Sequence, residues 1–283
     1  MNKTKIEWCR NPDGSDGHSW NPVTGCLHGC AYCYARRIAE RFSDEGSDEP
    51  ASRIHETNGI RYNDDNYPIG FPYGFEPTLH RHRLDEPKSR RKPSRIFVSS
   101  MGDLFGEWVP VEWIEAVLRT VRECPQHTFI FLTKNPKGYQ GHDYPPNAWL
   151  GVTCENQQAA NERIPHLLAT PAAVRFVSVE PMLGPVDLCT AAPCGECGEP
   201  DDDGVYNGCR GGEDCLDESW WWSSGIHWVI VGQQTGPGAT PPERVWVQEI
   251  ADACRHMRVP LFLKDNLRWP ERIQGFPQGG DSA

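Results

Sequence analysis

The stretch RIFVSSMGDLFGEWVPVEWIEAVLRTVRECPQHTFIFLTKNP, residues 95–136, combines the two patterns that decide the fold. RIFVSS and HTFIFLT are short apolar runs of the kind found in buried strands. The segment between them, residues 110–124, repeats apolar residues at helical spacing and opens with a proline suited to a helix start. The stretch therefore predicts a strand, a helix and a second strand parallel to the first.

The same alternation continues towards the C-terminus. Further apolar runs occupy residues 148–153, 174–180, 226–232 and 259–264, and helical patterns occupy residues 156–170 and 242–257. Repeated strand and helix units predict an α/β fold, a parallel sheet with helices outside, curled into a full or partial (β/α) barrel. We expect one domain, residues 1–283, interrupted by a cysteine-rich insert at residues 189–225.

The N-terminal third carries weaker signals. YARRIAERF, residues 34–42, predicts a short helix. From Ser43 to Pro93 the chain is rich in Gly, Pro, Asp and Arg, so we expect a functional lid or partly ordered loop with little regular structure.

The amino-acid composition indicates the cellular compartment and the kinds of partner that we expect. The chain has no run of about 18 apolar residues and no apolar N-terminal stretch, so we expect a cytoplasmic protein without membrane contact. In a reducing compartment, its 12 cysteines indicate metal or cluster ligation rather than disulfides. A net charge of −11 disfavours broad binding to nucleic acid. Residues 81–95 are locally basic, which fits either a solvated charged loop or a local nucleic-acid groove.

Three cysteines are clustered in GCLHGCAYCYA, where Cys26, Cys30 and Cys33 have C-x3-C-x2-C spacing. Three thiolates suit an iron–sulfur cubane and leave its fourth iron open to a small molecule. One alternative is a structural zinc site completed by Cys9, His18 or His28. Another is a set of reactive thiols without metal.

The triplet, with Tyr32 just before its last cysteine, resembles the signature of the radical S-adenosylmethionine superfamily. The resemblance implies that Cys26, Cys30 and Cys33 hold a [4Fe–4S] cluster, that S-adenosylmethionine binds the fourth iron, and that Tyr32 lies against the adenine. The Gly-Gly-Glu segment typical of the superfamily is not recognisable, and SSMGD, residues 99–103, stands near its expected place.

Segments such as NPVTGC, RIFVSSMGDLF, PQHTFIFLTKNP and WVIVGQQTGPGA resemble an uncharacterised family of phages and bacteria that is distantly similar to spore photoproduct lyase. This resemblance covers most of the chain outside residues 43–75 and the insert. The resemblance to the radical S-adenosylmethionine superfamily implies an enzyme that cleaves S-adenosylmethionine reductively to a 5′-deoxyadenosyl radical, and an electron donor such as flavodoxin or ferredoxin.

Polar residues follow each predicted strand, where a barrel would collect them in one mouth. They are Ser99, Ser100, Asp103, Lys134, Asn135, Glu155, Asn156, Glu180, Gln233, Gln234, Lys264 and Asp265. The candidate catalytic residues among them are Lys134, Glu180, Lys264 and Asp265. The candidate cofactor-binding residues, besides Tyr32, are Ser99, Ser100, Asp103, Glu155 and Asn156. For each residue the alternative is a helix cap or a surface ion pair.

The insert contains two cysteine pairs, Cys194 with Cys197 and Cys209 with Cys215. Four thiolates close a tetrahedral zinc site, and similar spacings also serve an auxiliary iron–sulfur cluster.

Two functional classes follow from these patterns. The first is a radical enzyme whose substrate could be a nucleic acid or nucleotide. The second is a non-enzymatic zinc or iron–sulfur module that binds nucleic acid. An open ligand position is of use to the enzyme alone, so the first is favoured.

Overall fold

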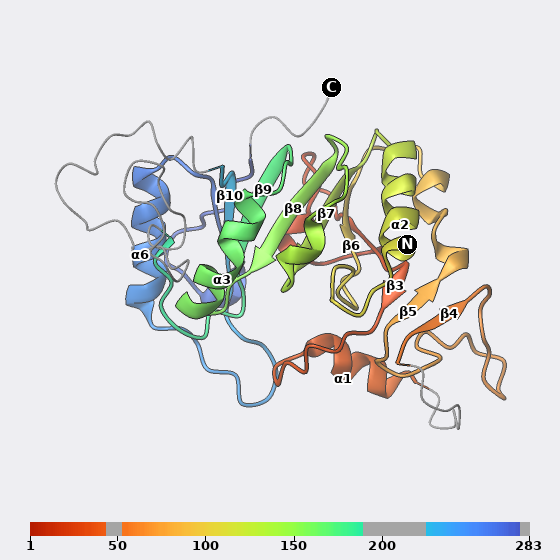
Figure 1. Ribbon diagram of the computed structural model, residues 1–283. Helices are drawn as coiled ribbons and strands as arrows, with labels where there is room; N and C mark the ends of the chain where they lie inside the picture. The colour runs from red at the N-terminus through yellow and green to blue at the C-terminus, as the bar shows by residue number, and fades with distance from the viewer. Residues whose placement is uncertain (44–52, 189–224, 278–283) are drawn as a thin grey trace, which may run out of the picture. The chain divides into compact units, whose positions relative to one another are not determined.

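The computed structural model describes residues 1–43, 53–188 and 225–277 (Figure 1). Contacts within the chain divide it into two compact units, the first ending at Ala148 and the second beginning at Trp149. Strands and helices alternate in both units, and most strand pairs are parallel. The α/β class predicted from the sequence is therefore confirmed. The predicted insert, residues 189–225, lies outside the described residues except for its last position.

The first unit contains most of the short elements. Its helices are α1 (Tyr34–Arg41) and α2 (Val111–Glu123), with short 3₁₀ segments η1 (Glu7–Cys9), η2 (Arg81–Arg83), η3 (Glu86–Ser89) and η4 (Pro136–Tyr139). Its strands are β1 (Asn2–Lys3), β2 (His18–Trp20), β3 (Val23–Thr24), β4 (His55–Thr57), β5 (Thr78–His80), β6 (Arg95–Val98) and β7 (Thr128–Thr133).

Four of these strands are hydrogen-bonded in the order β1-β2-β6-β7. β2, β6 and β7 are parallel, and the short β1 pairs antiparallel with β2. β6 is buried along its whole length, which explains the apolar run from Ile96 to Val98 that follows its first residue, Arg95. The pairing of β2 with β6 was not predicted, because HSW is too short to show a strand period.

A second sheet in this unit corrects the expectation for residues 43–93. β3, β5 and β4 pair in that order, and η2 and η3 follow β5. The Gly and Pro content of this segment predicts little regular structure, yet Thr78, Leu79 and His80 form a strand and are all buried. These strands are two or three residues long, so tertiary burial and not sequence period determines them.

The second unit has a simpler alternation. It contains β8 (Ala148–Thr153, whose first residue closes the first unit), α3 (Gln157–Leu168), β9 (Val174–Val179), β10 (Trp228–Val231), α6 (Arg244–His256), β11 (Leu261–Leu263) and η6 (Asp265–Leu267). The strands pair in the order β8-β9-β10-β11, all parallel. α3 packs against β9.

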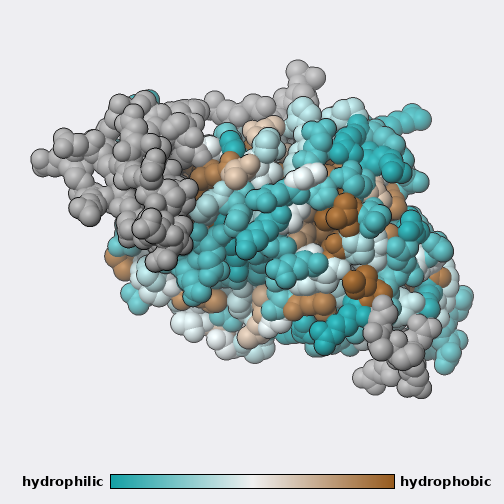
Figure 2. Space-filling view, viewed as in Figure 1, coloured by the Kyte–Doolittle hydropathy of each residue, from teal (hydrophilic) through white to brown (hydrophobic). Residues whose placement is uncertain are grey.

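All six strands and all four helices predicted from sequence patterns are present, with ends that differ by at most three residues. The buried face of α1 contains Ala35 and Ala39. The larger apolar residues Ile38 and Phe42, the latter just after the helix, are exposed. Figure 2 shows a mainly hydrophilic face on which hydrophobic residues form small separate patches. The described strand pairs establish parallel sheets, and closure into a barrel stays a prediction.

Aromatic side chains fill the core of the second unit around Trp228. Its ring lies 5.4 Å from the ring of Phe176 and 6.1 Å from that of Trp149, all three fully buried. The indole N–H of Trp228 donates to the carbonyl of Gly275 at 2.8 Å, so the one polar atom of this ring is satisfied.

Gly151 in β8 makes room for this aromatic cluster. A Cβ at this position would lie 2.3 Å from the ring of Phe176. We expect Gly151→Ala to lower the free energy of unfolding by roughly 1–3 kcal/mol, because an overpacked core must shift rings or backbone. Denaturant titration measures the change. Gly59→Ala is the matched control, since nothing lies within 4 Å of a Cβ there, and an equal loss in both variants would contradict the packing argument.

His80 in β5 makes stability depend on pH. Its Nε2 lies 2.8 Å from the hydroxyl oxygen of Thr24, and burial lowers the pKa of His80 to about 3. The unfolded chain takes up this proton near pH 6.5 and the folded chain does not, so stability falls as pH falls from about 6.5 towards 3. His80→Gln should reduce this slope by up to about 1.4 kcal/mol per pH unit.

The measurement is the free energy of unfolding of both proteins between pH 7 and pH 4. Identical slopes for the two proteins would show that His80 is not the group concerned.

Candidate functional site

The three cysteines of the triplet lie on one loop, the cysteine loop (residues 25–33), between β3 and α1. Cys33 caps α1, because its Sγ accepts a hydrogen bond from the backbone N–H of Arg36 at 3.3 Å. The N–H of Cys33 donates to the carbonyl of Cys30 at 3.1 Å. Regular structure therefore holds the loop at both ends.

The cysteine loop lies against the loop that follows β6, residues 99–103. The N–H of Gly25 donates to the carbonyl of Met101 at 2.8 Å. A Cβ on Gly102 would lie 2.8 Å from the Gly25 oxygen, and a Cβ on Gly25, whose φ is 84°, would lie 2.1 Å from the carbonyl oxygen of Glu76. Glycine at both positions permits this close approach of two backbones.

The thiols of Cys26, Cys30 and Cys33 are half-buried and form no disulfide. Cys26 and Cys33 pack against a core cluster that includes Phe71 and Phe75. Burial raises the pKa of Cys26 to about 12, although a backbone hydrogen bond at His28 lowers it. A thiol in this state is a poor nucleophile at neutral pH. The alternative of reactive metal-free thiols is therefore disfavoured for Cys26.

The zinc alternative needs a fourth ligand close to the triplet. Cys9 is buried, and its Sγ donates to the carbonyl oxygens of His18 at 3.5 Å and Arg95 at 3.6 Å. The Nε2 of His28 lies 2.8 Å from a carboxylate oxygen of Asp103. Among the described residues, no group of three or more His, Cys, Asp and Glu side chains could hold a metal ion. Cys9 and His28 thus already have other partners.

Ser99 has the least usual geometry of the predicted cofactor-binding residues. Its φ is 54°, in the left-handed region that is uncommon for serine. The residue is buried, and its hydroxyl has no hydrogen-bond partner within the described part of the chain. An orphaned buried hydroxyl on a strained residue is a feature of ligand-binding sites.

Asp103 is buried and accepts hydrogen bonds from several groups. Oδ1 accepts from the Thr133 hydroxyl at 2.7 Å and from the Phe105 N–H at 3.1 Å. Oδ2 accepts from His28 Nε2 at 2.8 Å and from the Lys134 N–H at 3.0 Å. Burial raises the pKa of Asp103, but these hydrogen bonds and the His28 charge outweigh it, so the pKa is lowered. The carboxylate is ionised and fully engaged.

Tyr32, Lys134 and Ser100 complete the group in the first unit. The ammonium of Lys134 lies 5.3 Å from the ring centroid of Tyr32, a cation–π distance. The Ser100 hydroxyl donates to Asn21 Oδ1 at 3.1 Å, and its carbonyl accepts from the Tyr34 hydroxyl at 2.6 Å. The structure thus brings Tyr32, the 99–103 loop and Lys134 together around the cysteine loop.

Glu180 and Lys264 form an ion pair in the second unit. They directly follow β9 and β11, and Gly232 follows β10 between them. A Cβ on Gly232 would lie 2.8 Å from Lys264 Cδ and 2.9 Å from Glu180 Cδ. The two side chains can therefore meet across the central strand because a glycine ends it.

Three further predicted residues have partners of other kinds. Glu155 pairs with Arg163 at 2.6 Å, and the Asn156 side chain caps α3 by accepting from the Ala159 N–H at 3.0 Å. Asp265 is exposed and accepts from Gln274 at 3.0 Å. These are the ion-pair and cap roles expected of non-functional residues, and a ligand role for these side chains stays a prediction.

A family model described as "Protein of unknown function (DUF5131)" matches residues 3–275. The chain belongs to this family. No curated protein and no solved structure matches this DUF5131 chain. No helix among its described residues is long and apolar enough to cross a membrane.

Three cationic residues of the basic stretch of this DUF5131 protein, residues 81–95, form ion pairs with acidic residues distant in sequence. The pairs are Arg81 with Glu56 at 2.6 Å, Lys88 with Glu123 at 2.6 Å and Lys92 with Asp13 at 2.9 Å. Arg83 is mostly buried and donates to the carbonyls of Asn21 and Gly70. These contacts favour the solvated, ion-paired loop over a nucleic-acid groove.

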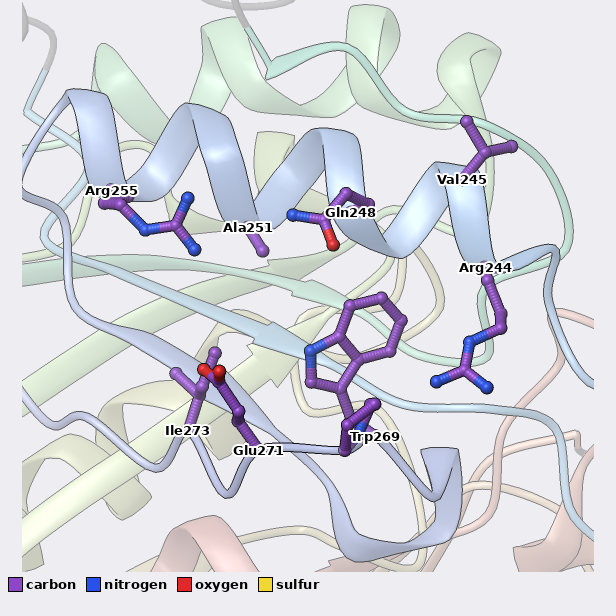
Figure 3. A pocket seen from close by; sticks show the side chains of 9 residues that line it. Arg244, Val245, Gln248, Ala251, Arg255, Trp269, Glu271 and Ile273 are labelled. Carbon is purple, nitrogen blue, oxygen red and sulfur yellow. The ribbon is translucent and has the colours of Figure 1, made fainter.

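A pocket of about 490 Å³ lies between α6 and the segment 269–273 of the second unit (Figure 3). The Arg244 guanidinium lies 5.3 Å from the ring centroid of Trp269. Figure 3 shows Arg244 and Arg255 at opposite ends of the pocket, with Trp269 between them. None of the residues predicted from the sequence lines it.

Sequence reasoning missed two residues that contact Asp103. The sequence indicates His28 only as a possible zinc ligand and does not single out Thr133. The available signals were a histidine between two of the clustered cysteines and a threonine at the end of a predicted strand. The predicted metal ligands Cys194, Cys197, Cys209 and Cys215 lie outside the described residues.

The Glu180–Lys264 pair should be energetically coupled. In a double-mutant cycle with Glu180→Gln and Lys264→Met, we expect a coupling of roughly 0.5–3 kcal/mol, because both side chains are largely shielded from water. Repeating the cycle in a Gly232→Ala background should reduce the coupling, since the new Cβ separates the partners.

Unfolding in denaturant measures each corner of the cycle. The exposed Asp252–Arg255 pair of α6 is the control and should couple by only about 0.2–0.5 kcal/mol. A coupling no larger for Glu180 and Lys264 than for this control would refute the prediction.

Proposed function

We propose that this chain is a radical S-adenosylmethionine enzyme that holds a [4Fe–4S] cluster on Cys26, Cys30 and Cys33. The observation that carries the proposal is one anchored loop that presents three free, half-buried thiols. Thiolates are the usual ligands of iron–sulfur clusters. The three ligands of a cubane bind different irons, so they need not converge on one point as the ligands of a single ion do.

Two further observations support the fit of the residues to this group. Gly25 and Gly102 keep the two loops in close contact without side chains between them. The orphaned hydroxyl of Ser99 is available to a ligand at the end of β6. When bound, the cluster would supply the electron that cleaves S-adenosylmethionine to methionine and a 5′-deoxyadenosyl radical.

The chain's own residues would bind and orient the cofactor. Tyr32 would contact the adenine, the Ser99 hydroxyl would donate to a polar group of the cofactor, and the Ser100 hydroxyl, which donates to Asn21, would accept from one. Lys134, whose ammonium lies near the Tyr32 ring, would attract the carboxylate of S-adenosylmethionine. In the second unit, Glu180 and Lys264 are the candidates for holding a proton at Oε1 or Nζ, and Glu155, Asn156 and Asp265 are candidates for further polar contacts.

The finer features of the prediction belong to the same proposal. They are a full or partial barrel, zinc or an auxiliary cluster on the insert cysteines, a flavodoxin or ferredoxin as electron donor, and a cytoplasmic location. The substrate class included in the proposal is a nucleic acid or nucleotide, as the distant similarity to spore photoproduct lyase implies. The ion pairs of residues 81–95 argue against extensive phosphate contacts there.

Replacing Cys26, Cys30 or Cys33 by Ala should abolish cluster binding, because a cubane seldom persists on two thiolates. Iron content and the electron resonance of the anaerobically reduced protein report the loss. With reductant and S-adenosylmethionine, the wild type should release 5′-deoxyadenosine and methionine slowly even without substrate.

Cys124→Ala is the control, because Cys124 lies at the end of α2 and should be dispensable for the cluster. The Cys30→Ala protein supplies the blank. If a wild type with an intact reduced cluster released no more 5′-deoxyadenosine than this blank, the radical-enzyme proposal would fail.

A further inference from the structure

Asp103 connects three segments of the first unit that are distant in sequence. It lies in the loop after β6. Its Oδ1 accepts from Thr133 and its Oδ2 from the Lys134 N–H, both at the end of β7. Oδ2 also accepts from His28 of the cysteine loop. The His28 bond spans 75 residues of sequence. It is the side-chain bond that ties the middle of the cysteine loop to the ends of two parallel strands.

His28 is held from a second side by an aromatic ring. The rings of His28 and Trp108 meet edge to face, with centroids 4.9 Å apart. His28 stands two residues from both Cys26 and Cys30, so a movement of its ring would move the backbone that carries these cysteines. Because an ionised carboxylate can only accept, the Nε2 of His28 carries the proton of this bond.

Asp103 itself is poorly placed to bind a cofactor directly. Both of its oxygens are filled by donors from the protein, two of them backbone N–H groups that a ligand cannot replace. A direct contact would break hydrogen bonds at a buried charge, which is costly.

We propose that Asp103 is a positioning residue that acts through His28 to hold the cysteine loop in the geometry that receives the cluster. This inference rests on the proposed function and assigns Asp103 a role beside the cofactor, in place of the direct contact expected from sequence. Hydrogen-bond partners behind metal ligands commonly have this effect, and their loss weakens metal binding by roughly 10–100-fold.

Asp103→Asn is the decisive variant. The amide nitrogen must face either Phe105 N–H or Lys134 N–H, and neither backbone donor can reverse its role. With the nitrogen on the Phe105 side, the amide oxygen still accepts from His28. In both orientations the bond to His28 loses its charged acceptor and is therefore weakened, while the side-chain volume is kept. We expect cluster release to a chelator to be roughly 10–100-fold faster than in the wild type, with an altered electron-resonance line shape.

Three companion variants separate positioning from general stability. His28→Leu should match Asp103→Asn, and the double variant should be no worse than either single variant, because both break the same link. His28→Gln should restore much of the retention, since its amide can donate to Asp103. Thr133→Val removes a different bond to the same carboxylate, together with the bond from the Asn135 N–H to the Thr133 hydroxyl, and should retain the wild-type release rate and line shape.

Alkylation of Cys30 and Cys33 in the metal-free protein gives an independent measurement. Asp103→Asn and His28→Leu should speed alkylation relative to the wild type, whereas Thr133→Val should not. The inference is overturned if Asp103→Asn alkylates and releases its cluster at wild-type rates, or if Thr133→Val loses as much as Asp103→Asn. A wild type that binds no iron would refute the proposed function, and the alkylation rates would still decide the role of Asp103.

Discussion

The hydrogen bond from the Gly25 N–H to the Met101 carbonyl is the constraint on which the candidate site depends. β2 and β6 pair in parallel, and the pairing continues beyond their ends. The Ser99 N–H donates to the Trp20 carbonyl at 2.7 Å, and the side chain of Asn21 accepts from Met101 N–H at 3.0 Å. The chain leaving each strand thus follows the other until the first cysteine, so the sheet itself determines where the cysteine loop lies.

This arrangement explains which parts of the fold could be predicted. The strands from residue 95 onward are mostly buried, and the helices α2, α3 and α6 among them are 12 or 13 residues long, so the sequence shows both the strand runs and the helical period. β2 and β3 comprise three and two residues, and their partners β6 and β5 lie more than 50 residues away. Pairing at that separation leaves no local pattern, and neither strand was predicted.

The candidate site also has a part that the sequence predicts and a part that it does not. The rule that polar residues gather after parallel strands selects Asp103, Lys134, Glu180 and Lys264, which make the contacts described above, and their roles stay predictions. It could not reveal that Asp103 binds His28, because that bond depends on the pairing of β2 with β6. The charges of residues 81–95 left two interpretations open for the same reason, since Asp13, Glu56 and Glu123, which pair with three of them, lie in other parts of the chain.

The two groups of predicted residues also differ in what stabilises them. Around Asp103, hydrogen bonds from backbone N–H groups hold one carboxylate, and the network joins loops that would otherwise move independently. The opposite charges of Glu180 and Lys264 instead neutralise each other in an ion pair across Gly232. A shielded ion pair is a weak source of stability compared with apolar side chains of similar size, and glycine at a strand end adds conformational entropy to the unfolded chain. Because apolar residues of similar size would contribute more stability than this pair and its glycine, stability alone does not account for the arrangement, which agrees with the proton-holding role proposed for the pair.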